Sequence, residues 1–169
     1  MGERETVKRF FDCAERFCSL IEHHQSLTAW EFVRSCASCL AELYGAAVPL
    51  SLLSVEIDSA ELIEDVISTD QARAIDRQIS EKLSGQCLYW EVLDTRIEND
   101  PVVDGLGVGD LADDMADIYR EVKNGLFAFN RGPKNEAIWH WQEGFRSHWG
   151  DHIVDALRGI HHIVRASLE

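Results

Sequence analysis

Apolar residues recur every three or four positions through most of this 169-residue chain, and this spacing constrains the fold more than any other feature. Such a period places the apolar side chains on one face of an α-helix. A chain of this length can also bury its own core without disulfides or metals. The pattern predicts an all-α fold, a compact bundle of five to seven helices, in which residues 1–169 form a single domain. The clearest stripes contain Val7, Phe10, Ala14, Phe17 and Ile21; Phe32, Cys36, Cys39 and Leu43; Ile75, Ile79 and Leu83; and Leu111, Met115, Ile118 and Val122.

Helix caps and helix breakers predict the limits of the second helix. Ser26 or Thr28 is expected to cap its start, because a side-chain oxygen there accepts a hydrogen bond from a free backbone N–H group. Gly45 and Pro49 are expected to end it just after Tyr44. This helix and the one before it should pack as an antiparallel hairpin.

The middle of the chain contains two further predicted helices. A short helix is expected after Asp58 or Ser59. A longer helix is expected between a cap at Ser68 or Thr69 and a terminating Gly85.

Two segments between these helices and the next are expected to be irregular. Residues 87–95, CLYWEVLDT, are rich in aromatic and branched residues and suggest extended chain. One short strand cannot form a sheet by itself, so we expect a buried connection here. Residues 94–109 contain Pro101 and three alternate glycines, and a surface loop is expected.

The charge of the chain restricts its partners. It contains 16 basic and 30 acidic residues, which give a formal net charge of −14 and a pI near 4.8. Nucleic-acid backbones and anionic membrane surfaces would be repelled by this charge. No apolar run approaches the roughly 20 residues that span a bilayer, and the charged N-terminus is unlike a signal peptide. We therefore expect a cytoplasmic protein that binds neither nucleic acid nor membrane.

The five cysteines are expected to be free thiols, because the number is odd and no secretory signal is present. Cys36 and Cys39 have the C-x-x-C spacing of redox and zinc sites. They also continue the apolar stripe between Phe32 and Leu43, and no strand precedes them. Burial in the core explains this pair better than redox chemistry.

Residues 110–125, DLADDMADIYREVKNG, combine an apolar stripe with five carboxylates on a neighbouring face. Two explanations remain open. Acidic residues in the first turns of a helix are stabilised by its dipole without any metal. Alternatively, Asp113, Asp114 and Asp117 converge on one Mg²⁺ or Mn²⁺ ion. The five carboxylates are those of Asp110, Asp113, Asp114, Asp117 and Glu121.

The last 36 residues contain a second dense apolar pattern, which predicts one long helix or two nearly collinear helices. His148 and His152 border this pattern, four residues apart, the spacing at which two imidazoles on one helix chelate a metal. Gly150 lies between them, and a helix break there would separate the rings. Histidines that are hydrogen-bonded near the core are the alternative explanation. The stripe contains Ile138, Trp141, Phe145, Trp149, Ile153, Leu157, Ile160 and Val164.

These two segments resemble the bacterial domain-of-unknown-function family 5063. The resemblance rests on DDMADIYREVKNGL and on the pattern W-x-x-x-F-x-x-H-W-G-x-H, and it spans most of the chain beyond the first helix. It implies a compact, mostly helical bacterial protein and supplies no activity, substrate or catalytic residue. The pattern consists here of Trp141, Phe145, His148, Trp149, Gly150 and His152.

Two classes of function are compatible with these observations. The first is a binding or scaffolding module without a cofactor, whose acidic surface is offered to a basic protein partner. The second is a Mg²⁺- or Mn²⁺-dependent hydrolase of a nucleotide or another phosphate compound. In the second, Asp113, Asp114 and Asp117 hold the ion, and His148 or His152 assists proton transfer. Both classes allow a polar seam in which the aspartates face the two histidines.

Overall fold

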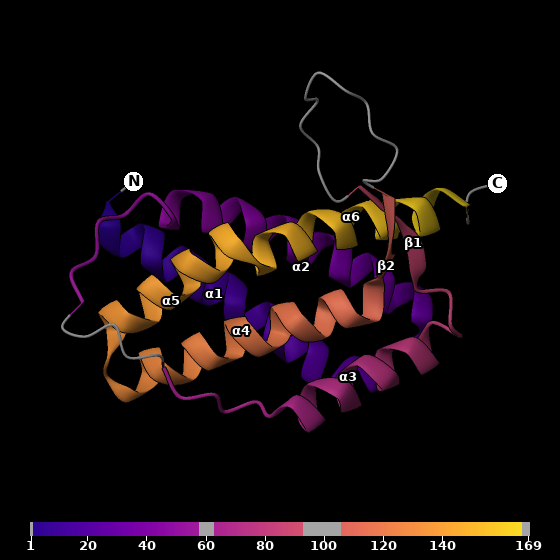
Figure 1. Cartoon of the computed structure of the whole chain (residues 1–169), viewed down its shortest axis with the longest axis horizontal. Helices are drawn as coiled ribbons and strands as arrows, with labels where there is room; N and C mark the ends of the chain where they lie inside the picture. The colour runs from indigo at the N-terminus through magenta and orange to yellow at the C-terminus, as the bar shows by residue number, and fades with distance from the viewer. Residues whose placement is uncertain (1, 58–62, 93–105, 167–169) are drawn as a thin grey trace, which may run out of the picture.

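The computed structural model describes residues 2–57, 63–92 and 106–166, which form six α-helices and one two-stranded sheet (Figure 1). The predicted all-α bundle is confirmed, with a small β-ribbon added at one end. The elements are α1 (Glu3–Glu22), a 3-10 turn (His24–Ser26), α2 (Ala29–Leu50), α3 (Thr69–Lys82), β1 (Leu88–Val92), β2 (Leu106–Asp110), α4 (Leu111–Arg131), α5 (Lys134–Ser147) and α6 (Trp149–Ala166).

The cap predicted for the second helix is confirmed, but its predicted end is wrong. Thr28 and Glu31 form a capping box, in which the Glu31 backbone N–H donates to Thr28 Oγ1 at 3.2 Å. Helix α2 then continues through Gly45 and Pro49 to Leu50. Ala46, Ala47 and Leu50 are fully buried in the core. Their burial favours continuation of the helix, against the roughly 1 kcal/mol that a glycine and the roughly 3 kcal/mol that a proline cost inside a helix.

Helix α3 begins as predicted, at a Ser68 cap that pairs with Gln71. The chain leaves this helix through Gly85, whose φ of +71° is a left-handed conformation that glycine adopts without strain. Before the helix, the buried Asn124 of α4 accepts hydrogen bonds from the backbone N–H groups of Val66 and Ile67. The helix predicted after Asp58 or Ser59 falls on residues 58–62, outside the described residues.

The prediction of a buried connection without a sheet is wrong. Strand β1 pairs with β2 in antiparallel register, with Tyr89 opposite Gly109 and Trp90 opposite Val108. The surface loop predicted over residues 94–109, from Pro101 and three alternate glycines, is wrong for residues 106–109, which belong to β2. Residues 94–105 of that prediction lie outside the described residues. Gly109 is needed in the strand, because a Cβ there would lie only 2.4 Å from Tyr89 Cζ. Glycine within a strand often marks such a close approach.

Helix α4 packs against α1, α3, α5 and α6, contacts β2 and lies at the centre of the bundle (Figure 1). Asp110 caps its start, with the Ala112 N–H donating to Asp110 Oδ1 at 2.9 Å. The predicted apolar stripe is confirmed as buried. Its members Leu111, Met115, Ile118 and Val122 all lie in the core with Phe10, Phe17, Phe32, Leu40, Trp141 and Trp149.

The C-terminal segment forms two helices, as one of the two predictions allowed, but the break lies at His148 and not at Gly150. The His148 N–H donates to the Gly144 carbonyl at the end of α5. The His148 carbonyl in turn accepts from Asp151 at 3.0 Å in α6. Gly150 is required here because a Cβ would lie 2.1 Å from the Phe145 carbonyl oxygen.

The described cysteines are free, as predicted. Cys36 is buried in the core, whereas Cys39 is only half-buried. Burial raises the pKa of both thiols, that of Cys36 by far more. Among the helices within residues 2–57, 63–92 and 106–166, none has the length and hydropathy needed to cross a membrane.

We predict that Cys36 reacts slowly with a thiol reagent in the native protein, because it is buried and carries little thiolate near neutral pH. Cys39 should react first, and all five thiols should react rapidly after unfolding. Mass spectrometry of partially labelled protein measures this order, and Cys39→Ser identifies the fast site. Equal, immediate labelling of Cys36 in the folded protein would contradict the packing of α2.

Candidate metal centre

One face of α4 meets the junction between α5 and α6 at a group of three potential metal ligands. Asp117 lies on α4, His148 is the single residue between α5 and α6, and His152 lies one turn into α6. The two Nε2 atoms are 3.2 Å apart. Asp117 Oδ2 lies 4.0 Å from His148 Nε2 and 3.8 Å from His152 Nε2.

These three separations fit a bound metal ion closely. A circle through three atoms so placed has a radius of about 2.1 Å, which is the Zn–N and Zn–O distance of protein zinc sites. An ion at that point lies in the plane of the three atoms; a tetrahedral ion needs ligand atoms about 3.4 Å apart, so Asp117 Oδ2 would move roughly 0.5 Å closer to the two nitrogens. Among the described residues, this is the one group of three or more His, Cys, Asp or Glu ligand atoms that lie within 4.8 Å of one another.

His152 is oriented by a buried carboxylate behind it. Its Nδ1 lies 2.7 Å from Oδ1 of Asp114, which is only 5% exposed. The other oxygen, Asp114 Oδ2, accepts a hydrogen bond of 2.5 Å from the Tyr89 hydroxyl of β1. Tyr89, Asp114 and His152 thus form a continuous hydrogen-bonded chain.

His148 is also hydrogen-bonded to a carboxylate. Its Nδ1 is hydrogen-bonded to Glu121 Oε1, one turn beyond Asp117 on α4. Asp117 is held from its outer side, because Arg120 lies 3.3 Å from Asp117 Oδ1. Each of the three potential ligands therefore has a partner that fixes its direction, as second-sphere groups do in metal sites.

These partners determine which nitrogen of each imidazole is free. An ionised carboxylate only accepts hydrogen bonds, so both Nδ1 atoms must carry a proton. In neutral imidazoles, both Nε2 atoms would then direct lone pairs into a gap of 3.2 Å. A proton or a metal ion between them removes this repulsion. The hydrogen bond to Asp114, together with the nearby charges of Asp114 and Asp117, raises the pKa of His152 despite its burial.

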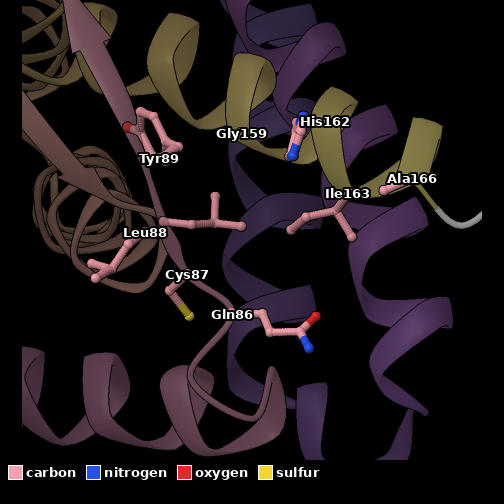
Figure 2. Close-up of a pocket in the computed structure, with 9 residues that line it drawn as sticks. Gln86, Cys87, Leu88, Tyr89, Gly159, His162, Ile163 and Ala166 are labelled. Atoms are coloured by element: carbon pink, nitrogen blue, oxygen red, sulfur yellow. The ribbon is translucent and has the colours of Figure 1, made fainter.

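Tyr89 reaches Asp114 because two glycines make room for its ring. It lies between Gly109 of β2 and Gly159 of α6, where a Cβ would be 2.4 Å and 2.9 Å from the ring. Behind the ring, a cavity of about 480 Å³ opens between β1 and the end of α6 (Figure 2). Its lining is mostly apolar and includes Cys87, Leu88, Leu111, Gly159 and Ile163.

The structure brings together four of the five residues predicted for a metal site. Asp117, His148 and His152 present ligand atoms to one another, and Asp114 supports His152 from behind. Asp113 is exposed and lies outside this group. Arg146, the basic residue in the last turn of α5, is also outside this group: it lies 3.5 Å from Glu143 and donates to the Ser51 carbonyl.

Two residues of the site were not predicted from the sequence. Glu121 was counted among the acids of the helix but was not assigned to the histidines. Its spacing of seven residues from Asp114 and four from Asp117 places all three on one face, and this signal was available. Tyr89 comes from a distant segment, and no sequence pattern links it to Asp114.

Comparisons with known proteins agree with this fold. The family described as "Domain of unknown function (DUF5063)" matches residues 2–166. The crystal structure of protein BF1032 from Bacteroides fragilis is similar at a TM-score of 0.78 and 23% sequence identity, over 94% of this chain and 91% of that chain. This likeness shows a shared fold. The comparison with curated proteins finds no match. Because the family match covers nearly the whole chain, the protein belongs to the DUF5063 family.

Proposed function

We propose that this protein binds a single divalent transition-metal ion through His148 Nε2, His152 Nε2 and Asp117 Oδ2. The observation that carries the proposal is the pair of Nε2 atoms 3.2 Å apart, each on an imidazole whose Nδ1 faces a carboxylate. Carboxylate–histidine–metal arrangements of this kind fix the tautomer and increase the basicity of the ligand nitrogen.

The ligand set favours zinc or iron over the magnesium or manganese expected from the aspartates alone. Imidazole nitrogen suits Zn²⁺, Fe²⁺ and related ions, whereas Mg²⁺ prefers six oxygen ligands in octahedral geometry. The three aspartates would have supplied oxygen only, whereas the atoms that lie within 4.8 Å of one another belong to one carboxylate and two imidazoles, which supports a metal that prefers nitrogen. We take Zn²⁺ as the working ion.

Three protein ligands leave a coordination position for water or substrate. This open position distinguishes catalytic zinc sites from closed structural ones, which have four protein ligands. His148 and Asp117 are partly exposed, so solvent reaches the site from their side. A metal-bound water there would be activated for attack on a polarised bond, which makes metal-assisted hydrolysis the reaction class to test first.

Protein binding is a second candidate function, favoured by the exposed face of the β-ribbon. Leu88, Trp90 and Val108 are 67%, 72% and 62% exposed. Leu88 and Trp90 are two residues apart and lie on the same face of β1, and Val108 of β2 is directly opposite Trp90. Exposed apolar groups of this kind mark interaction surfaces, and the charge of −14 favours a basic partner.

We predict that the immobilised chain retains basic proteins through this face and that Trp90→Ser releases them. Trp30→Ser, at a partly exposed tryptophan of α2, is the matched control and should retain them. Equal retention by wild type and Trp90→Ser would remove the ribbon as the binding surface.

We predict that zinc at 100 times its dissociation constant stabilises the fold by about 2.7 kcal/mol, provided that it does not bind the unfolded chain. For a chain of this size, that is a rise of roughly 5 to 10 °C in melting temperature. Asp117→Asn should abolish the rise because it removes a ligand. Asp113→Asn is the matched control: it makes the same change one turn earlier on α4 and should keep the rise. A melting temperature that does not respond to zinc in the wild type would refute the proposal.

We predict opposite pH dependences for the metal-free and zinc-loaded proteins. Because the pKa of His152 is raised in the fold, its protonated form contributes stability that is complete below the unfolded pKa of about 6.5. That contribution is lost as the pH rises through the higher folded pKa. Zinc competes with this proton for Nε2, so the stabilisation by zinc should grow between pH 6 and pH 8.

Melting temperatures measured with and without zinc across this pH range test both effects. His152→Gln should remove them, whereas His161→Gln, at an exposed histidine of the same helix, should leave them intact. A zinc effect that is independent of pH would show that His152 is not a ligand.

A further inference from the structure

The second buried tryptophan of the bundle carries an unsatisfied donor. Among the described residues, Trp149 Nε1 is the buried side-chain atom that has no hydrogen-bond partner, and Trp149 itself is 0% exposed. A buried donor left unpaired is unfavourable, and such an atom in a folded protein requires a physical explanation.

The indole N–H and the carboxylate that supports His148 border the same small space. Gly144 of α5 creates this space, because it has no side chain. A Cβ at Gly144 would lie 2.7 Å from Trp149 Nε1 and 2.3 Å from Glu121 Oε2. The unpaired Trp149 N–H thus lies near Oε2 of Glu121, and the other oxygen of this carboxylate, Oε1, is hydrogen-bonded to His148.

The structure shows no hydrogen bond between these two groups, and we propose that a small rotation of the Glu121 carboxylate into the space beside Gly144 brings Oε2 to the indole N–H. Trp149 is then a positioning residue of the metal centre, which holds Glu121 and through it the imidazole of His148. The inference rests on the metal site proposed above. Oε1 of Glu121 is already bonded to His148 Nδ1–H, and after this rotation Trp149 Nε1–H would fix Oε2 as well. A carboxylate that cannot rotate directs the imidazole more firmly toward the ion.

The ring of Trp149 is suited to this role because the core immobilises it. Its centroid lies 5.1 Å from that of Phe145 and 6.1 Å from that of Phe10 of α1. Trp149 also follows His148 directly in the chain, so the metal ligand and the residue proposed to position it both lie at the junction of α5 and α6. Packing in the core of the bundle thereby helps to set the orientation of the His148 imidazole.

Trp141 provides a matched control. It is also 0% exposed, but its Nε1–H donates to the Val122 carbonyl at 3.1 Å and not to a group of the metal site. Trp149→Phe and Trp141→Phe each remove one buried indole N–H and keep an aromatic ring. Only the first removes the proposed support of Glu121.

The experiment compares zinc binding by calorimetry, and the visible spectrum of the Co²⁺-substituted protein, in the wild type and the two variants. Trp149→Phe should weaken zinc binding by about 10-fold or more, as second-sphere changes do, and should alter the Co²⁺ spectrum. Trp141→Phe should leave both unchanged. Gly144→Ala serves as a second variant: alanine favours the helix, but its methyl group would fill the space between the Glu121 carboxylate and the Trp149 ring and keep them apart, so zinc binding should also weaken.

A measurement on the metal-free protein tests the contact itself. The indole N–H resonance of Trp149 should shift in Glu121→Gln and remain in place in Glu143→Gln, which changes an exposed carboxylate of α5. An unchanged resonance in Glu121→Gln, or zinc affinity in Trp149→Phe and Gly144→Ala equal to that of the wild type, would overturn the inference. Failure of the wild type to bind zinc would instead overturn the metal site on which the inference rests.

Discussion

The burial of the Asp114 carboxylate is the constraint on which the rest of the site depends. An ionised carboxylate loses its hydration when it is buried, and this is tolerated only with strong partners. Asp114 is 5% exposed, and its partners come from elements far apart in the chain: the Tyr89 hydroxyl of β1 and the His152 imidazole of α6. One buried charge therefore ties the ribbon and the last helix to α4, and it sets the orientation of a potential metal ligand.

Helix α4 combines two roles because its apolar stripe and its acidic face are adjacent. The stripe places the helix in the centre of the bundle, and the neighbouring face then meets the junction of α5 and α6. The single-residue break at His148 matters here, since it allows His148 and His152 to approach with ring centroids 4.6 Å apart. Gly144 and Gly150 permit this junction by leaving room for Glu121, Trp149 and the Phe145 carbonyl.

The sequence predicted those features that depend on local periodicity. Apolar stripes and capping residues identified the bundle and the Thr28 and Ser68 caps, because these signals lie within one helix. The extension of α2 and the strand β2 were mispredicted, since core burial outweighed a glycine and a proline in the first case and Tyr89 required a glycine in the second. The pairing of the aspartates with the histidines was anticipated. The exclusion of Asp113 and the inclusion of Glu121 depend on where α5 and α6 lie against α4, which helical spacing alone does not determine.

The central claim is that two imidazoles and one carboxylate share one ion, and diffraction from zinc-soaked crystals tests it most directly. Anomalous differences at the zinc edge should show one strong peak about 2.1 Å from His148 Nε2, His152 Nε2 and Asp117 Oδ2. Asp114 and Glu121 should remain on the two Nδ1 atoms. A peak elsewhere, or none at this point in crystals soaked at millimolar zinc, would contradict the account and leave the histidine–carboxylate network as a structural feature of the bundle.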